Sequence, residues 1–311
     1  MAESTDHELF EQVIRRINPQ GKLLRFWPLM GGVSAQVTGL EIELPDGHLE
    51  KMIVRRHGAV DLQHNPHIAA EEFALLQILQ SSALPTPVPY HLDETGTIFP
   101  TPYLVVEFID GEPEFAPPNL QDFIRQIVAA LTQIHQINGS KPTLNYLPKQ
   151  MNVVTEKLRQ RPDSPDESLD EGRIREILGA KWPLVQVNPS TLLHGDFWPG
   201  NILWKHGQLL AVVDWEDALL GDPLADLAYA RLEILWAFGH EAMQDFTERY
   251  RDARDAMPPL DFRNLPFWDL WAALRPAGKL GTWGLDPAVE SQMRERHKAF
   301  VNQALANLRA S

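Results

Sequence analysis

Cysteine is absent from the 311 residues, and long apolar runs are absent as well. Without a thiol the chain cannot form disulfides, a thiolate nucleophile or a zinc site with cysteine ligands. No stretch approaches the roughly 20 consecutive apolar residues that a membrane-spanning helix needs. The first residues, MAESTDH, are polar and acidic, unlike the apolar core of a secretory signal. We therefore expect a cytoplasmic protein that has no membrane partner.

Positive charge is scarce. Lys and Arg number 28 against 42 Asp and Glu, which gives a formal net charge of -14. Such a field repels a phosphate backbone, so we expect no nucleic-acid partner. An acidic surface mostly serves solubility, although it would also suit a cationic substrate. The chain shows neither a heptad run nor an obvious exposed apolar strand, so we expect a monomer or a weak homodimer.

The length suffices for two lobes, each with its own core, and a cleft between them. The first part, residues 1–106, shows short strand-like runs and helical spacing, whereas apolar residues recur every 3.6 positions from about Asn119 onward, in a helix that we expect Gly139 to end. This pattern predicts an α+β protein. A small N-terminal lobe with an antiparallel sheet plus a helix (1–106) is followed by a hinge (107–111) and a larger, mainly helical C-terminal lobe (112–311).

The most informative stretch is LLHGDFWPGNILW, residues 192–204. An apolar strand there ends in His194-Gly195-Asp196, and Asn201 follows Asp196 by five positions. A second apolar strand then delivers Asp214. A buried strand that ends in an acid holds that acid rigidly. Phosphoryl transfer by kinases needs an Asp near the attacking hydroxyl, an Asn that ligates metal and a later Asp that also ligates metal. The order of these residues matches that requirement.

Two upstream features would suit a bound phosphate. Residues 30–36, MGGVSAQ, join two predicted strands, and Gly32 and Ser34 would let backbone N–H groups approach an anion, although Gly-Gly is also a common turn. The predicted strand 49–56 places Arg55 on the face opposite Met52 and Val54.

A predicted helix over residues 67–81 carries Glu71 and Glu72. We choose Glu72 as the partner of Arg55, by analogy with the Lys–Glu pair of kinases. Either acid could instead compensate the helix dipole, and an Arg at a strand end is ordinarily a surface residue.

The strand after Pro102 runs to Ile109 and ends in Asp110-Gly111. We expect an interlobe hinge here, with the backbone of residues 107–109 available to an adenine edge. Further along, Asp222 and Asp226 precede or open a helix, where we expect them to cap it and to orient the loop that carries Asp214. His135 lies on an apolar helical stripe and is read as a core histidine.

With these residues in hand, the chain resembles the aminoglycoside phosphotransferase and choline kinase family, the small-molecule branch of the protein-kinase-like fold. The resemblance runs from Gly31 to the helix after Asp226. It rests mainly on three motifs: His194-Gly195-Asp196 with Asn201, Asp214-Trp215-Glu216, and Gly221-Asp222-Pro223 with Asp226.

The resemblance implies a two-lobed kinase-like fold that uses ATP and Mg²⁺ to transfer the γ-phosphoryl group to a hydroxyl of a small molecule. It implies that Asp196 is the catalytic aspartate, that His194 braces its loop, and that Asn201 and Asp214 are metal ligands. The remaining implied contacts are with nucleotide: Gly32 and Ser34 in the phosphate loop, Arg55 and Glu72 as the charge pair, and Glu107, Phe108 and Ile109 at the adenine.

Two points stay open. Arg55 stands where many kinases have lysine; it keeps the charge, but its planar fork is not equivalent. This departure motivates the alternative of a nucleotide-binding regulatory module or pseudokinase. Glu216 could hold a second metal or meet the substrate. The acceptor is also open among aminoglycosides, choline-like amines, homoserine, sugars and macrolides.

Overall fold

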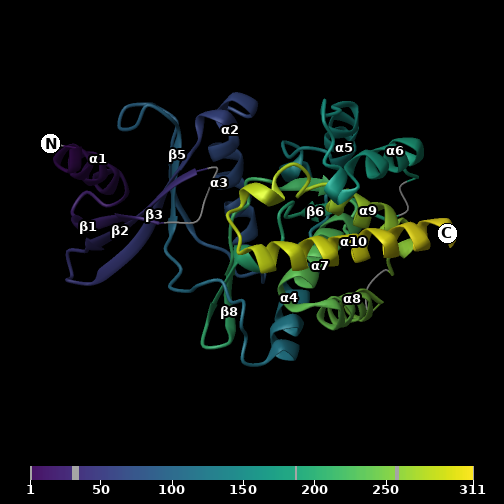
Figure 1. Cartoon of the computed structure of the whole chain (residues 1–311). Coiled ribbons are helices and arrows are strands. Elements are labelled where there is room, and N and C mark those ends of the chain that lie inside the picture. Colours follow the sequence, from purple (N-terminus) through teal and green to yellow (C-terminus); the bar gives the residue numbers. More distant parts are fainter. Residues whose placement is uncertain (1, 30–34, 186–187, 256–258, 311) are drawn as a thin grey trace. The chain divides into compact units, whose positions relative to one another are not determined.

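The computed structural model describes residues 2–29, 35–185, 188–255 and 259–310 (Figure 1). The chain forms two compact units. The first contains Met1–Gly111 and Leu210–Glu216, and the second contains Glu112–Leu209 and Asp217–Ser311. The segment 210–216 therefore belongs with residues that precede it by about a hundred positions. Among the described residues, no helix combines the length and apolar character needed to cross a membrane.

The first unit is built on a five-stranded sheet with the order β1-β2-β3-β5-β4, in which every neighbouring pair is antiparallel. The predicted small antiparallel sheet is thereby confirmed. The central strand, β3, carries Arg55 and is held on both sides, by β2 and by β5. The strands are β1 (Lys22–Pro28), β2 (Ala35–Glu43), β3 (Leu49–His57), β4 (Pro89–Asp93) and β5 (Tyr103–Glu107).

Successive side chains of β3 point to opposite faces of the sheet, so the two faces have different surroundings. Met52 and Val54 are buried in an apolar cluster that includes Phe10 and Ile14 of helix α1 (Ala2–Ile17). Helix α3 (Ile68–Leu79) contacts β3, β4 and β5. A short helix, α2 (Ala59–His64), precedes it and was not predicted, because its six residues bury no side chain and so carry no apolar periodicity.

The second unit is mainly helical and also contains short strands. β6 (Thr191–Leu193) pairs with β9 (Leu219–Gly221) within it. β7 (Ile202–Lys205) forms a two-stranded sheet with β8 (Gln208–Val212), whose last three residues are assigned to the first unit. The helices, visible in teal to yellow in Figure 1, are α4 (Leu120–His135), α5 (Gln150–Arg159), α6 (Glu171–Lys181), α7 (Leu224–Phe238), α8 (His240–Asp255), α9 (Leu265–Ala273) and α10 (Pro287–Ala310).

Helix α4 starts where the sequence predicted but ends earlier. The side chain of Asn119 caps it by accepting the N–H of Asp122. The expected end at Gly139 was wrong, because residues 137–139 leave the helix to pair with the start of β6. Ile137 accepts the N–H of Leu192, and Gly139 donates to the carbonyl of Ser190. The segment that follows α4 is thereby joined to the strand that leads into the His194 loop.

Candidate active site

The His194 loop begins where the buried strand β6 ends, and its backbone is fixed by helix α7. Gly195 has a φ of +82°, and a Cβ at this position would lie 2.0 Å from the carbonyl oxygen of Asp217, so only glycine fits. The carboxylate of Asp226 accepts the N–H of His194 at 2.6 Å and the N–H of Gly195 at 3.0 Å. One side chain thus satisfies two successive amides of the loop.

Asp226 is itself buried and ionised. Nε2 of His135 donates to its carboxylate at 3.4 Å, while Nδ1 of the same ring lies 2.6 Å from the hydroxyl of Tyr250. Burial alone would raise the pKa of Asp226, but the bonds from His135 and the loop amides hold it below its ordinary value. His135 is thus the predicted satisfied core histidine.

The predicted role of Asp226 needs correction. It orients the loop that carries Asp196, whereas we had expected it to orient the loop that carries Asp214. Asp222 does cap α7, since its carboxylate accepts the N–H of Leu224, and it also accepts from the side chains of Asn188 and Trp268.

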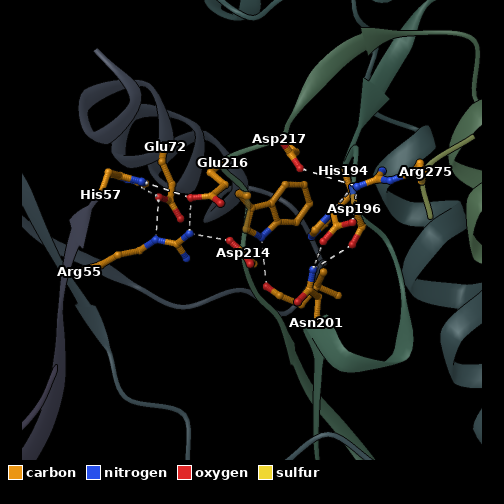
Figure 2. A network of polar contacts seen from close by, with 12 residues as sticks. Arg55, His57, Glu72, His194, Asp196, Asn201, Asp214, Glu216, Asp217 and Arg275 are labelled. Carbon is orange, nitrogen blue, oxygen red and sulfur yellow. Dashed lines mark hydrogen bonds and ion pairs between the residues drawn. The ribbon is translucent and has the colours of Figure 1, made fainter. Parts of the chain in front are cut away.

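The side chains of Asp196 and Asn201 face each other within this loop (Figure 2). A short 3₁₀ turn, Pro199–Asn201, brings the Asn201 amide back, and its Nδ2 donates to both Oδ2 and the backbone carbonyl of Asp196 at 2.9 Å. These bonds occupy the NH₂ group of Asn201 and leave its carboxamide oxygen as the remaining acceptor. The ring of the buried His194 accepts the N–H of Asp196 at 3.3 Å.

Sequence reasoning missed Arg275, which contacts the same loop. It follows helix α9, and its Nη2 lies 2.6 Å from Oδ1 of Asp196 while Nη1 donates to the carbonyl of Gly195. Its guanidinium also stacks over the ring of Tyr229, 3.9 Å from the centroid. A lone arginine so far from the motif carries no pattern that links it to Asp196.

The first unit holds a second charged cluster, around Arg55 (Figure 2). Arg55 Nη2 lies 2.6 Å from Asp214 Oδ1 and 2.6 Å from Glu216 Oε2, and Arg55 Nε lies 3.4 Å from Glu72. Burial alone would lower the pKa of Arg55, but the three acids raise it above its ordinary value, so the guanidinium stays charged. Glu72 is the buried acid of α3, whereas the carboxylate of Glu71 accepts from the side chain of Asn65.

His57 completes this cluster, and sequence reasoning overlooked it. Its ring is fully buried, with Nε2 3.2 Å from Glu72 and Nδ1 3.2 Å from Glu216. Burial opposes protonation, but the two carboxylates outweigh it and raise the pKa of His57 to about 8. The alternation of side chains along β3 could have predicted this position, because it places His57 on the same face as Arg55.

The contacts of His57 with Glu72 and Glu216 predict that the stability of the protein depends on pH. Because its pKa is raised above the unfolded value of about 6.5, its contribution is complete below pH 6.5 and is lost as the pH rises through about 8. A difference of about 1.5 pKa units corresponds to about 2 kcal/mol. We expect wild type to exceed His57→Gln in free energy of unfolding by about that much more at pH 6 than at pH 9, as measured by urea denaturation. A gap that does not change with pH would mean that the pKa of His57 is the same in the folded and unfolded protein, and a gap that grows with pH would mean that His57 is neutral when folded.

Asp214 occupies a strained backbone position in the same unit. Its φ is +67°, in a region that residues other than glycine rarely adopt, and strain of this kind concentrates at functional sites. The indole N–H of the buried Trp215 donates to the carbonyl of Val212 at 3.1 Å, and the N–H of Val212 donates to Pro85. Burial raises the pKa of Asp214, and Arg55 opposes that rise.

The predicted hinge residues lie at and just after the end of β5. The N–H of Glu107 donates to Val88 and the N–H of Phe108 to Lys51, while the carbonyl of Ile109 accepts from Gly111. The ring of Phe108 packs edge-on against Trp27. The predicted phosphate-loop residues Gly32 and Ser34 lie outside the described residues.

A model of the family described as "Phosphotransferase enzyme family" matches residues 32–277. The chain belongs to this family. The matched range takes in every predicted site residue, from Gly32 to Asp214, and reaches Arg275 as well.

Curated relatives of this phosphotransferase family member are larger proteins. Acyl-CoA dehydrogenase family member 10 of Mus musculus is 27% identical over 198 residues, which is 58% of this chain and 18% of the relative. Acyl-CoA dehydrogenase family member 11 of Homo sapiens is 25% identical over 200 residues, 59% of this chain and 25% of the relative. The chain thus spans about a quarter or less of the length of these two relatives.

Solved structures confirm the kinase-like fold of the family. Amicoumacin kinase in complex with AMP-PNP, Ca²⁺ and Ami matches with a TM-score of 0.64 and 14% identity over 97% of this chain and 95% of that one. A thermostable mutant of aminoglycoside phosphotransferase APH(4)-Ia, with ADP and hygromycin B, matches with a TM-score of 0.61 and 14% identity over 94% and 97%.

Proposed function

We propose that the protein is a kinase that uses ATP and Mg²⁺ to transfer the γ-phosphoryl group to a hydroxyl of a small molecule. Family membership supports a phosphotransferase, and AMP-PNP and ADP in the solved relatives support the use of ATP. The observation that carries the proposal is the Asp196 loop. Its backbone is fixed by Asp226, and its carboxylate is oriented by Asn201.

The donor atoms fit magnesium. Mg²⁺ prefers oxygen ligands and in phosphotransferases takes one or two from the protein, with phosphates and water supplying the rest. Asn201 offers a carboxamide oxygen, because its NH₂ is committed to Asp196, and Asp214 offers a carboxylate. We propose these two as the metal ligands. When bound, the ion neutralises the charge that develops on the phosphates.

In the proposed reaction Asp196 orients the acceptor hydroxyl and accepts its proton, and His194 braces the backbone of the loop. Phosphoryl transfer requires little covalent chemistry from the protein, so fixed positions and fixed charges do most of the work. Arg55, held by Glu72, supplies positive charge toward the nucleotide. Gly32 and Ser34 are proposed to contact the phosphates, and the backbone of Glu107, Phe108 and Ile109 the adenine.

The cluster also narrows the role of Glu216. Its carboxylate accepts from Arg55 and lies 3.2 Å from the His57 ring. We propose that it balances these two cations, in place of either role left open by the sequence. Arg55 pairs with the buried Glu72 as a kinase lysine would, which weighs against the pseudokinase alternative.

The test is a direct search for the acceptor. The full chain is incubated with MgATP and a panel of aminoglycosides, amino alcohols, sugars, macrolides and hydroxylated metabolites, and products are detected by mass spectrometry. We expect at least one product with an added phosphoryl group, and we expect its formation to stop when EDTA removes the metal and to return with excess Mg²⁺. Tight binding of MgATP without any product or hydrolysis would support the regulatory module, and turnover that is insensitive to EDTA would contradict the proposed metal ligands.

A further inference from the structure

We propose that Arg275 is a positioning residue for Asp196, which it holds by a charged contact that the family motif does not include. The inference rests on the proposed function, because it concerns how the catalytic aspartate is oriented. It is carried by the contacts of Arg275 with Gly195, Asp196 and Tyr229.

The loop is held from two sides by opposite charges. The Asp226 carboxylate binds the N–H groups of His194 and Gly195, and the Arg275 guanidinium binds the carbonyl of Gly195 and the side chain of Asp196. Both backbone polar groups of Gly195, its N–H and its carbonyl, are therefore held by charged side chains. Hydrogen bonds to charged partners are about twice as strong as neutral ones.

The carboxylate of Asp196 is also held at both oxygens. Arg275 binds Oδ1 at 2.6 Å, and Asn201 binds Oδ2 at 2.9 Å. Two donors that approach from different residues restrict rotation about both side-chain torsions. Each oxygen keeps a second lone pair, so the carboxylate can still accept from an acceptor hydroxyl. The side chain of Asp196 is 23% exposed, which leaves it accessible to a small molecule.

Helix α7 also positions Arg275, through Tyr229. Asp226, Tyr229 and Glu233 are spaced by three and four residues, so they lie on one stripe of the helix. Asp226 binds the loop directly, and the ring of Tyr229 packs against the guanidinium of Arg275. Glu233 lies on the same stripe, and burial raises its pKa to about 7 against the opposing effect of Arg275, so its carboxyl is only partly ionised near neutral pH. One helix face thus sets both supports of the loop.

The experiment compares Arg275→Ala and Arg275→Lys with a matched control, Arg249→Ala. Arg249 has almost the same exposure as Arg275 (38% against 37%) and pairs with Asp245 on the same unit at 2.8 Å, but it does not touch the loop. With whichever acceptor the wild type uses, or water if ATP hydrolysis is faster, we expect kcat of Arg275→Ala to fall about 10²-fold. KM for MgATP should stay unchanged, and added guanidinium should restore part of the rate of Arg275→Ala. The rate of Arg275→Lys should lie between those of Arg275→Ala and wild type.

A second readout does not depend on turnover. In ¹⁵N-labelled protein, the side-chain NH₂ signals of Asn201 report its bond to Asp196, and we expect them to shift in Arg275→Ala but not in Arg249→Ala. If the wild type has no activity yet the signals shift, the proposed function fails while the positioning role stands. Unshifted signals, an unchanged kcat, or a loss confined to KM for the acceptor would each overturn the role.

Discussion

Asp196→Asn should lower kcat for phosphoryl transfer by about 10²–10⁴-fold, the range typical of a positioned acid–base group. Asparagine has nearly the same shape, but it cannot take a proton from the acceptor, and its single oxygen can accept from Arg275 or from Asn201 but not from both. Affinity for MgATP, measured by calorimetry, should be nearly unchanged, because the proposed metal ligands are intact. Steady-state kinetics at saturating MgATP is the decisive measurement.

Asp245→Asn is the matched control for this substitution. Asp245 is also an aspartate paired with an arginine in the second unit, yet it lies on α8 and is bonded to Arg249 rather than to the loop. It should retain wild-type kcat. If Asp196→Asn and Asp245→Asn turn over equally well, Asp196 is not the residue that activates the hydroxyl.

Arg55→Met should destabilise the protein by about 3–5 kcal/mol, the usual cost of removing one partner from a buried ion cluster. Arg55 is 13% exposed at its side chain and meets Glu72, Asp214 and Glu216 at once. Without it, Glu72 and Glu216 would still face the imidazole of His57, but Asp214 would lose its ion pair with Arg55. We also expect weaker MgATP binding. Urea denaturation gives the stability change, and calorimetry gives the nucleotide affinity.

The neighbouring arginine provides the control. Arg56 lies on the same strand but stacks over the ring of Phe99, 4.4 Å from its centroid. Loss of one such contact costs about 0.5–1 kcal/mol at partly exposed sites, so Arg56→Met should have a small effect on stability and none on nucleotide binding. Equal losses in the two variants would contradict a special role for the Arg55 cluster. Arg55→Lys should fall between wild type and Arg55→Met, because an ammonium cannot reach all three acids with a fixed fork.

Local patterns predicted much of the fold. The alternation of β3 correctly placed Met52 and Val54 in the core and Arg55 on the other face, because a strand has a strict period of two. The loop motif brought together Asp196 and Asn201, whose separation of five residues is short enough for one turn to close. The antiparallel sheet and the kinase-like fold were likewise predictable.

Contacts made over long sequence separations were not predictable. His57 was missed because the predicted strand ended at Arg56, and because nothing in the strand pattern shows that two carboxylates meet its ring. Arg275 lies 79 residues after Asp196 and reaches it only because α7 and α9 pack together. The end of α4 was misplaced for the same reason, because its last predicted turn pairs instead with a strand about fifty residues later.

The first unit is discontinuous in sequence, and this has a consequence for synthesis on the ribosome. When residues 1–111 have been made, Glu72 is already present to balance Arg55 and His57, but Asp214 and Glu216 belong to a segment that is translated about a hundred residues later. Domains generally fold as units in the order of their synthesis. Here the nascent N-terminal unit would carry an excess of positive charge in its centre and would reach its final state only after about half of the second unit had emerged.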